Sequence, residues 1–553
     1  MQRIQRASLC GWVGLLAACS TVEADSDTAP GSTSLNPSDP SASATESTAA
    51  SQPTSESSPT GESSPTGGQT DATTGGTTSD TSATEGEDTG DTGEPGELGG
   101  PFLRGINFGY RNPSWGDPDM GWLAAQAGST SARLSLHEGH LDKWGYDIEV
   151  GDMQAYQADG MSHHIAFLIA PIAAHSTAPE GTPDWELAHH IPKNLYLPVQ
   201  IDGAVNPDNY WATYVFKTVD TYKNYVDTWE VWNEPDWVAD YNATLTWDSQ
   251  APTAAQLVRF GGSIHDYVRM LRVTAEAAKL ADAAAKIALG GIGYPSFLDA
   301  LLRYTDEPNA GAVTPEYPAT GEAYFDVLNY HYYPLWTPGS SDAGVEGFVK
   351  LRDEFAAKMA AAGAAPRPFS VTEVGAPRSS YDGQPGGAEY ARNFNVKVMT
   401  RAHAEGFLRV DWFALSDGDH DSAFGEMGLY DDVKDLAAKE DAVRTPTGVA
   451  ARTHGTLLAD ALFDPAATAA LGFGAEAHGY AFRLPDDRQA LVLWAHAGGT
   501  DEAAQVHVDL ATSQSFELHA WDFSATGTKT PLSPNGGVIG LDLTASPVIL
   551  VEP

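Results

Sequence analysis

Short apolar runs alternate with longer amphipathic stretches along most of the chain after Gly100. Eight of these runs are mostly rich in Val, Ile, Leu, Phe and Tyr, which is typical of strands buried on both faces. They predict strands, in order, at Gly105–Tyr110, Ala132–His137, His164–Pro171, Thr228–Trp232, Lys286–Gly293, Asp326–Tyr332, Pro368–Glu373 and Arg409–Leu415.

Amphipathic stretches separate these runs and predict the connecting helices. The clearest is Ala254–Ala284, where apolar residues recur at intervals of three or four, and Glu346–Ala362 and Ala388–Glu405 are two more. Eight strands, each followed by a helix, predict an α/β fold of the (β/α)8 barrel type over residues 101–457. The alternative is a doubly wound open sheet, which is disfavoured because no Gly-rich phosphate turn follows the first strand.

After about Leu458 the spacing changes, and short runs are separated by Gly, Asp, Ser and Pro turns with no long helix between them. This pattern predicts a small all-β sandwich over residues 458–553. An independent sugar-binding module is an alternative interpretation of the same segment. The predicted strands are Tyr480–Leu484, Gln489–Ala495, Gln505–Leu510, Ser515–Phe523, Val538–Leu543 and Pro547–Val551.

Residues 20–100 have a different composition. They contain no Lys, Arg, Phe, Trp or Tyr but 15 Asp and Glu, and the sequence from Glu56 to Gly61 is repeated from Glu62 to Gly67. A segment with so few large apolar residues cannot bury enough surface to offset the entropy lost on ordering. We therefore predict a disordered, extended linker.

The first 19 residues predict an export signal. Arg3 and Arg6 precede a mostly apolar run from Ala7 to Ala18, which is too short for a transmembrane helix of roughly 20 residues. The run ends Leu-Ala-Ala-Cys, which resembles the lipobox of bacterial lipoproteins. The resemblance implies lipidation at Cys19 and a tether to the outer membrane or cell surface. No other apolar stretch approaches membrane length, so we expect no other membrane contact. The alternative is an ordinary secretory signal with an incidental cysteine.

Charge and cysteine content exclude several classes of function. The formal net charge is -43, with 74 acidic and 31 basic residues. Nucleic acids and anionic lipids are disfavoured as partners, because binding phosphates needs a surplus of Lys and Arg. The two cysteines, Cys10 and Cys19, both precede the predicted folded region. A disulfide framework, a Cys-based zinc site and a catalytic cysteine are therefore excluded from residues 101–553.

Two glutamates stand where predicted barrel strands end. The fourth strand runs into Trp232-Asn233-Glu234-Pro235, and the seventh ends at Thr372-Glu373. Reactive side chains of barrels lie at the C-terminal ends of strands. Two carboxyl groups facing each other suit glycoside hydrolysis, in which one donates a proton to the leaving oxygen and the other attacks the anomeric carbon or activates water. Glu230, on the same strand as Glu234, is predicted to support the site or to be ion-paired.

The Trp232–Pro235 segment resembles the Asn-Glu-Pro signature of clan A glycoside hydrolases, and the sequence around it, Glu230–Asp236, looks closest to family 39, with family 5 second. The sixth strand, Asn329–Pro334, is similar to their His-x-Tyr segment. The family 5 resemblance lacks a clear match for the histidine after the third strand, because Pro171–His175 only approximates it. The resemblance implies a barrel, retention of anomeric configuration, and no metal or organic cofactor.

The resemblance also implies roles for individual residues. Glu234 corresponds to the acid/base and Glu373 to the nucleophile, with the two carboxyls roughly 5 Å apart. Five further residues are candidates for binding substrate or supporting this pair: Asn233, toward the sugar 2-OH; Arg133, beside the nucleophile; His331, against the substrate or the acid/base; Tyr333, hydrogen-bonded to the nucleophile; and Trp412, as a platform beneath the sugar.

These features predict an exported, lipid-tethered retaining β-glycosidase that acts as a monomer on an extracellular poly- or oligosaccharide. A catalytically silent carbohydrate-binding protein and a transglycosidase with the same glutamates are the alternatives. The segment Ile172–Asp227 would favour exo action if it closes the cleft and endo action if it leaves it open. Gly290–Gly293 is expected to allow close backbone approach. Five tryptophans near strand-to-helix loops are candidate sugar platforms: Trp115, Trp144, Trp237, Trp247 and Trp336.

Overall fold

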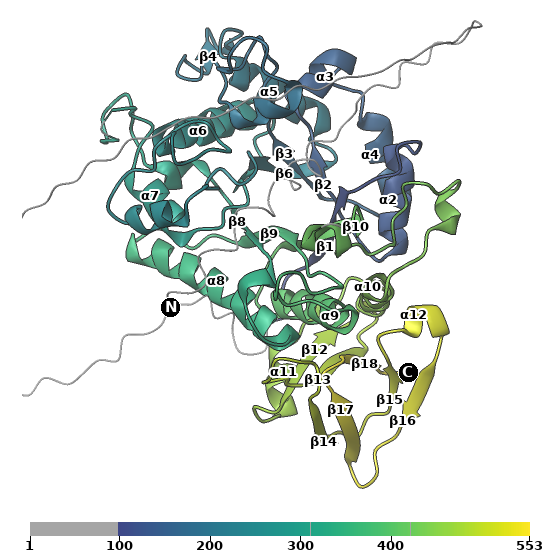
Figure 1. Ribbon diagram of the computed structural model, residues 1–553. Helices are drawn as coiled ribbons and strands as arrows, with labels where there is room; N and C mark the ends of the chain where they lie inside the picture. The colour runs from purple at the N-terminus through teal and green to yellow at the C-terminus, as the bar shows by residue number, and fades with distance from the viewer. Residues whose placement is uncertain (1–97, 310, 421) are drawn as a thin grey trace, which may run out of the picture. The chain divides into compact units, whose positions relative to one another are not determined.

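The computed structural model describes residues 98–309, 311–420 and 422–553 (Figure 1). The predicted signal peptide, the lipidation site at Cys19 and the linker up to residue 97 lie outside the described residues. The predicted domain boundary near residue 458 stays a prediction.

Eight parallel strands form one sheet with the order β7-β6-β3-β2-β1-β10-β9-β8. Isolated parallel bridges, Ala288 to Val327 and Ile292 to Tyr330, join β7 to β8 and close the barrel. Each strand overlaps one of the eight predicted runs, so the predicted (β/α)8 fold is confirmed. The barrel strands are β1 (Leu103–Gly109), β2 (Arg133–Ser135), β3 (His164–Leu168), β6 (Val226–Val231), β7 (Lys286–Leu289), β8 (Leu328–Tyr332), β9 (Phe369–Val374) and β10 (Arg409–Ser416).

Helices pack around the outside of this sheet (Figure 1). Their apolar faces and the outward side chains of the strands form one continuous core, which includes the fully buried Trp211, Trp229 and Tyr330. The helices of the barrel region are α2 (Asp117–Gln126), α3 (Glu138–Trp144), α4 (Val150–Ala158), α5 (Tyr210–Tyr222), α6 (Ile264–Ala281), α7 (Pro295–Arg303), α8 (Ser341–Ala361), α9 (Ala388–Ala404) and α10 (Pro446–Leu457).

The predicted helix Ala254–Ala284 is shorter than expected, because α6 begins only at Ile264. Ser263 caps α6, its side chain accepting from the Asp266 N–H while the Asp266 carboxylate accepts from the Ser263 N–H. Just before this cap, Gly261 has a φ of +71°, and a Cβ there would lie 2.1 Å from the His189 carbonyl oxygen. Residues 254–263 therefore form a turn-rich segment that packs against the chain around His189.

The segment Ile172–Asp227 is also more ordered than its sequence suggested. It contains a 3₁₀ helix, η1 (Asp184–His189), the short strands β4 (Gln200–Ile201) and β5 (Ala204–Val205), and the helix α5. The side chain of Asn209 caps α5 by accepting from the Ala212 N–H.

The C-terminal residues form an antiparallel β structure of two layers, as predicted. The six-stranded sheet has the order β11-β12-β13-β18-β15-β16, and the pair β14-β17 packs on it through Leu510, Ile539 and Leu541. The strands are β11 (Leu462–Phe463), β12 (Ala477–Arg483), β13 (Gln489–Ala495), β14 (Gln505–Ala511), β15 (Phe516–His519), β16 (Lys529–Leu532), β17 (Val538–Thr544) and β18 (Val548–Val551), with the helices α11 (Pro465–Leu471) and α12 (Phe523–Thr526).

The outer face of the six-stranded sheet packs on the barrel helices. One buried cluster joins Val396 of α9 and Ala450 of α10 to Phe482 and Trp494 of the sheet. Beside it, the fully buried ammonium of Lys397 lies 2.8 Å from a carboxylate oxygen of Asp342, and the Trp494 indole donates to the other oxygen at 2.8 Å. The sandwich thus shares a core and a buried ion pair with the barrel.

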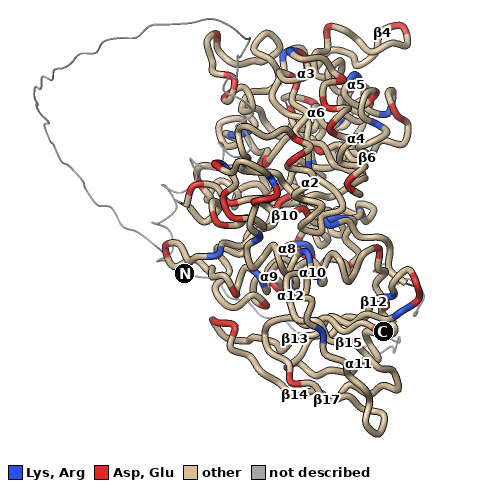
Figure 2. The backbone as a smooth tube through the Cα atoms, turned by 90° about the vertical axis from the view of Figure 1, so that its right-hand side faces the viewer, with Lys and Arg blue, Asp and Glu red and all other residues tan. Residues whose placement is uncertain are grey.

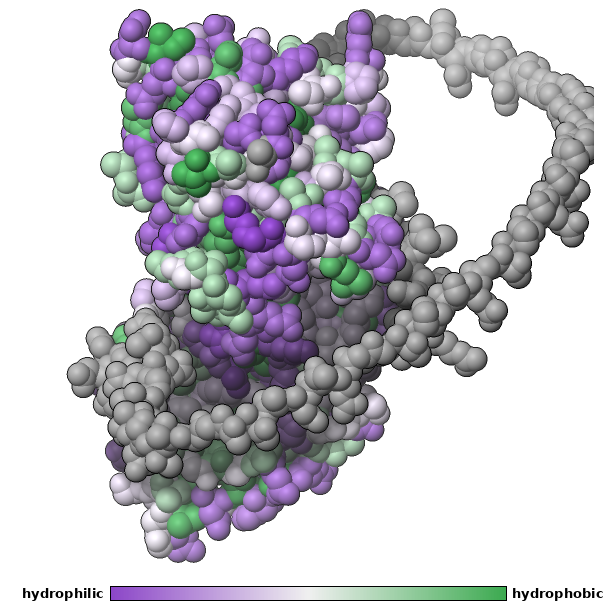
Figure 3. All heavy atoms as spheres, turned by 90° about the vertical axis from the view of Figure 1, so that its left-hand side faces the viewer, coloured by the Kyte–Doolittle hydropathy of each residue, from purple (hydrophilic) through white to green (hydrophobic). Residues whose placement is uncertain are grey.

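The described surface is polar and acidic. Lys and Arg are few and scattered among Asp and Glu along the backbone (Figure 2). On the face drawn in Figure 3, the visible apolar residues are dispersed among polar ones. None of the helices within the described residues is both long enough and apolar enough to cross a bilayer.

Candidate active site

Arg133 is the centre of a buried ion-pair network inside the barrel. Its Nε and one NH2 group donate to both oxygens of Glu230 at 2.8 and 2.9 Å, and its other NH2 group donates to Glu373 Oε1 at 2.6 Å. The guanidinium also donates to Asn233 Oδ1 at 2.7 Å and stacks over the Phe167 ring. The side chains of Arg133 and Glu230 are fully buried. Glu230 is therefore ion-paired, as predicted.

Glu234 and Glu373 face each other across this network. The carboxylate of Glu373 accepts from Arg133 on one oxygen and from the Tyr333 hydroxyl, at 2.6 Å, on the other. Glu234 lies just beyond β6, where Trp232 and Glu234 have φ angles of +73° and +47°. One carboxylate oxygen of each glutamate lies within 4.8 Å of the other.

His331 of β8 lies between the two glutamates. Its Nδ1 is 3.0 Å from Glu234 Oε1 and 3.6 Å from Glu373 Oε2, and its Nε2 is 3.1 Å from the Thr372 hydroxyl. Burial lowers the pKa of His331, but the neighbouring carboxylates outweigh burial and raise the pKa above its ordinary value. When the ring is protonated, its positive charge stabilises the negative charge on both glutamates.

Glu234 has a second cationic partner that its sequence context did not indicate. Arg259, in the segment before α6, donates from its guanidinium to Glu234 Oε2, and this guanidinium stacks over the Trp237 ring at 4.7 Å. Burial raises the pKa of Glu234, but Arg259 and His331 outweigh burial and lower the pKa to about 2. In this arrangement Glu234 is a carboxylate.

An aromatic wall stands beside Glu373. The Tyr333 ring makes edge contacts with Phe413 and Phe424, at centroid distances of 6.2 and 5.0 Å. Phe413 follows Trp412 on β10, and Phe424 comes from the short 3₁₀ helix η5 (Ala423–Glu426) after β10. No sequence pattern singled out either phenylalanine, although both are more than 90% buried beside a residue that binds Glu373.

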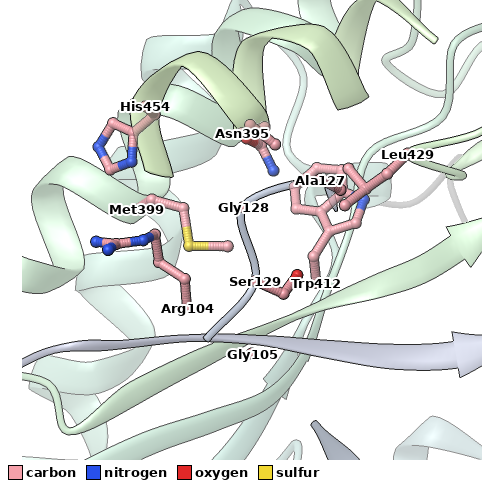
Figure 4. Close-up of a pocket in the computed structure, with 11 residues that line it drawn as sticks. Arg104, Gly105, Ala127, Gly128, Ser129, Asn395, Met399, Trp412, Leu429 and His454 are labelled. Atoms are coloured by element: carbon pink, nitrogen blue, oxygen red, sulfur yellow. The ribbon is translucent and has the colours of Figure 1, made fainter. Parts of the chain in front are cut away.

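Trp412 does not lie beneath the site, which corrects the predicted platform role. Its indole is 1% exposed, donates to the Met427 carbonyl at 2.8 Å and contacts Phe394 of α9. Figure 4 shows its ring beside Asn395 of α9 and Leu429, in a narrow pocket between the barrel strands and the helices. The preceding Asp411 points into the barrel and forms two hydrogen bonds with Arg409. Trp412 therefore points outward.

Polar side chains on neighbouring strands fix the backbone under the site. Asn329 of β8 and Thr372 of β9 exchange hydrogen bonds. The Asn329 side-chain amide donates to the Thr372 hydroxyl at 2.8 Å, and the Thr372 backbone N–H donates to Asn329 Oδ1 at 3.1 Å. Asp236, two residues after Glu234, accepts from the N–H groups of Gly293 and Tyr294. Burial raises the pKa of Asp236 to about 7. These bonds hold the Glu234 loop against the chain after β7.

Gly290 and Gly291 provide the close backbone approach that the sequence predicted. A Cβ on Gly290 would lie 2.4 Å from the Val231 carbonyl oxygen, and a Cβ on Gly291 would lie 2.0 Å from His331 Nε2. The φ of Gly291 is +62°. Only glycine at position 291 leaves room for the His331 ring in the place where it contacts Glu234.

We therefore expect Gly291→Ala to displace His331 and to lower kcat/KM by roughly 100-fold, the scale of a misplacement of about 1 Å in an active site. The measurement is steady-state turnover of an aryl glycoside by the folded variant. Gly293→Ala is the matched control, because a Cβ there meets nothing within 4 Å. Equal activities of the two variants would contradict this account of His331.

The tryptophans proposed as sugar platforms divide into three groups by exposure. Trp144 and Trp336 are each 53% exposed. Trp247 is fully buried, so ordinary packing explains it and its predicted platform role is wrong. Trp115 is partly buried, and the partly buried Trp237 holds Arg259.

Three groups of side chains in the described residues have ligand atoms close enough to hold a metal ion. Each group already contacts a cationic side chain: Arg259 donates to Glu234, Lys397 to Asp342 and Arg111 to Asp117. That pairing disfavours a divalent metal at all three, and the expectation that no cofactor is needed stays a prediction. The groups are Glu234 with His331 and Glu373, Asp342 with His478 and His496, and Asp117 with Glu149 and Asp152.

The fold of the chain is similar to that of solved structures of glycosidases. No family model and no curated protein matches the chain. Among solved structures, a family 39 glycoside hydrolase from the gut symbiont Bacteroides cellulosilyticus WH2 is similar at 16% identity, covering 82% of this chain and 81% of that chain with a TM-score of 0.55. A monomeric beta-xylosidase from Caulobacter crescentus CB15 matches at 15% identity, covering 82% and 98% of the two chains with a TM-score of 0.49. The chain thus shares its fold with a family 39 glycoside hydrolase.

Proposed function

We propose that the protein is a retaining glycoside hydrolase acting on the O-glycosidic, β-configured bonds of a poly- or oligosaccharide. The observation that carries the proposal is the separation of the two glutamates, whose nearest ligand oxygens lie within 4.8 Å. Retaining enzymes hold their two carboxyl groups about 5–5.5 Å apart, whereas inverting enzymes leave about 6.5–9.5 Å for a water molecule. The buried Glu234–Glu373 pair suits the shorter arrangement.

In the first step, Glu373 attacks the anomeric carbon while Glu234 gives its proton to the leaving oxygen. The bond from the anomeric carbon to the leaving oxygen breaks, and an ester bond to Glu373 forms. Arg133 and the Tyr333 hydroxyl both donate to Glu373. They hold it as an oriented carboxylate, which is the form that a nucleophile needs.

In the second step, the Glu234 carboxylate takes a proton from water, and the water oxygen attacks the anomeric carbon. The ester bond to Glu373 breaks, so two inversions give net retention. The low pKa of Glu234 beside Arg259 and His331 suits a group that is a carboxylate before this step. Asn233 is placed by Arg133 and is proposed to bind the sugar 2-OH.

A transglycosidase would use the same two glutamates and differ only in the acceptor of the second step. A catalytically silent carbohydrate-binding protein is the other alternative. It is disfavoured by the two buried glutamates, each held by cationic and hydrogen-bonding partners that suit chemistry on a glycosidic bond.

Glu234→Ala tests the assignment of the acid/base. Activated aryl β-glycosides need little acid assistance, so the variant is expected to form the glycosyl-enzyme and then stall. Sodium azide should restore turnover and give a β-glycosyl azide, because azide replaces the water that Glu234 would deprotonate. The measurement is aryl release and product anomer with and without azide, and an α-azide or no rescue would contradict the assignment.

We also propose that the enzyme is exported and tethered through lipid at Cys19, where it meets its carbohydrate as a monomer. The lipobox-like sequence before Cys19 and the length of chain before the barrel support this location. Bacterial cells fed radiolabelled palmitate should label the full-length protein, and Cys19→Ser should remove the label. Labelling of the serine variant, or none of the parent, would contradict the tether.

A further inference from the structure

A buried chain of hydrogen bonds links Glu230 to Glu234 beneath the site. The Thr372 hydroxyl lies 3.2 Å from Glu230 Oε1 and 3.1 Å from His331 Nε2. The other ring nitrogen of His331, Nδ1, lies 3.0 Å from Glu234 Oε1. Thr372 and Glu230 are fully buried, and His331 is 6% exposed. The donors and acceptors of this chain therefore have to satisfy one another.

The hydrogens of this chain follow from its donors and acceptors. Asn329 Oδ1 accepts from the Thr372 backbone N–H, so the Asn329 side-chain nitrogen is the donor to the Thr372 hydroxyl. The hydroxyl has one hydrogen and two candidate acceptors, the Glu230 carboxylate and a bare His331 Nε2. Hydrogen bonds to a charged acceptor are the stronger ones. The hydroxyl therefore donates to Glu230 and accepts from His331, so Nε2 carries a hydrogen.

Because Nε2 carries a hydrogen, Nδ1 is the nitrogen of His331 that exchanges a proton, and it faces Glu234. Two arrangements satisfy the contact between them. In one, the imidazolium donates from Nδ1 to the Glu234 carboxylate, and in the other, a protonated Glu234 donates to a bare Nδ1. Both arrangements contain the same number of protons, and they interconvert when one proton crosses one hydrogen bond.

The charged arrangement is the one at rest. Burial alone would raise the pKa of Glu234, but Arg259 and His331 hold that pKa at about 2. Burial alone would lower the pKa of His331, but Glu373 and Glu234 raise it. The proton that a leaving group needs therefore lies on His331 before the reaction, one hydrogen bond away from the acid that delivers it.

The attack of Glu373 changes the charge beside this ring. Glu373 Oε2 lies 3.6 Å from His331 Nδ1. Glu373 loses its negative charge when it forms the ester, and a buried positive charge that loses its partner is costly. If the proton delivered to the leaving oxygen comes from His331 and Glu234, that pair loses one positive charge in the same step. The two changes cancel, whichever other groups surround the site.

We infer that His331 and Glu234 hold one proton between them, and that Thr372 is the positioning residue that directs this proton toward Glu234. The inference rests on the proposed glycosidase function. In the first step the proton moves from His331 Nδ1 to Glu234 Oε1, and the leaving oxygen takes it from Glu234 as the bond to the anomeric carbon breaks. In the second step a proton from water returns by the same path to Nδ1 while the water oxygen attacks.

Several charged groups surround the pair, so its titration is coupled to theirs. The pKa measured by an activity profile belongs to the His331–Glu234 pair and not to either residue alone. The charged or titratable neighbours are Glu230 of β6, Glu373 of β9, Arg133 of β2 and Asp411 of β10 around His331, with Arg259 and Asp236 beside Glu234.

The test measures how kcat/KM of the full-length protein depends on pH, with a phenyl β-glycoside whose leaving group needs acid assistance. The value should fall as the pH rises through the pKa of the pair. Thr372→Val removes the acceptor of the Nε2 hydrogen and destabilises the imidazolium. This alkaline limb should therefore move to lower pH by about one to two units, the scale of one lost hydrogen bond to a charged group. Thr372→Ser keeps the hydroxyl and should keep the limb.

Two controls isolate the delivered proton. The 2,4-dinitrophenyl β-glycoside of the same sugar has a leaving group that departs without a proton, so the shape of its alkaline profile should be the same in wild type and Thr372→Val. Thr274→Val is the matched variant, because the fully buried Thr274 hydroxyl also accepts from a ring nitrogen, the Trp211 indole, at 2.8 Å. Thr274 lies on the outer helix α6, so its loss should leave both profiles unchanged.

An active wild type whose alkaline limb for the phenyl glycoside coincides with that of Thr372→Val would overturn the inference and leave the proposed function standing. A limb that moves equally for the dinitrophenyl glycoside would also overturn it, because the shift would not concern the proton given to the leaving group. No turnover of either glycoside by wild type at any pH would overturn both the inference and the proposed function.

The ring nitrogens give a readout that needs neither turnover nor a folded Thr372→Val. In full-length protein labelled with ¹⁵N-histidine, the NMR signals that disappear in His331→Gln belong to His331. On the acid side of the limb both ring nitrogens should carry a hydrogen, and on the alkaline side only Nε2 should keep one. A ring that is neutral on both sides, or a neutral ring with its hydrogen on Nδ1, would overturn the inference.

Discussion

Replacing Glu373 with Ala is expected to abolish turnover of aryl β-glycosides, lowering kcat by roughly 10⁵-fold or more, the range seen when an enzyme loses its nucleophile. Aryl leaving groups depart without acid help, so the loss cannot be attributed to Glu234. Glu373 is 1% exposed and bound by Arg133 and Tyr333, which leave its carboxylate oriented toward Glu234. The measurement is release of nitrophenol by purified full-length protein.

A control separates chemistry from folding in this experiment. Glu354→Ala removes a half-exposed carboxylate on α8 and should leave turnover unchanged. Formate or azide added to Glu373→Ala should restore aryl release by taking the place of the lost carboxylate and should give an α-configured product. Turnover within tenfold of wild type in Glu373→Ala would remove Glu373 from the proposed mechanism.

Arg133→Met should cause the largest loss of stability in the barrel. Glu230 and Glu373 would lose the guanidinium that they share, and leaving buried carboxylates unpaired costs about 3–5 kcal/mol. The free energy of unfolding, from chemical denaturation, should fall by that amount. Turnover should fall by roughly 100-fold or more, because Glu373 loses a fixed donor that stabilises its ionised form.

A double variant checks the electrostatic reason. Arg133→Met with Glu230→Gln removes both charges of the fully buried pair, so the double variant should be more stable than Arg133→Met alone. Arg352→Gln, whose partners Asp353 and Glu405 are solvent-accessible, should change stability by about 0–1 kcal/mol. Equal stability of the single and double variants would show that volume, and not charge, dominates at position 133.

The sequence could identify Glu234 and Glu373 as candidates because each stands at the end of a short apolar run. A carboxylate at the end of a buried strand is costly unless it belongs to a functional site. Arg133, His331 and Tyr333 followed from their positions on or beside neighbouring strands, and the structure brings all three to Glu234 or Glu373. The roles of these residues in catalysis stay predictions until turnover is measured.

The error at Trp412 has a physical cause. All eight residues of β10 are buried, so no alternation of polar and apolar positions indicates which side chains face the barrel interior. The charged Asp411 supplies the missing signal, because a buried carboxylate needs partners and finds Arg409 inside the barrel. If Asp411 points inward, Trp412 points outward.

Arg259 was missed because it fell within a predicted helix. The apolar spacing of residues 254–284 continues across the true start of α6, so periodicity alone could not locate where this helix begins. Gly261-Gly262 followed by Ser263 and Asp266 is a start signal for a helix, and reading it would have placed Arg259 in a loop. Its contact with Glu234 depends on how residues 254–263 fold back, which no local pattern encodes.

Glu234 and Glu373 are proposed to perform a double displacement. Proton NMR during hydrolysis of the aryl β-glycoside that the enzyme turns over tests it most directly, because the anomer formed first is recorded before mutarotation mixes the two forms. A double displacement predicts that the β anomer appears first and the α anomer only later. The α anomer appearing first would mean inversion by a single displacement, and the assignment of Glu373 as a nucleophile would be wrong.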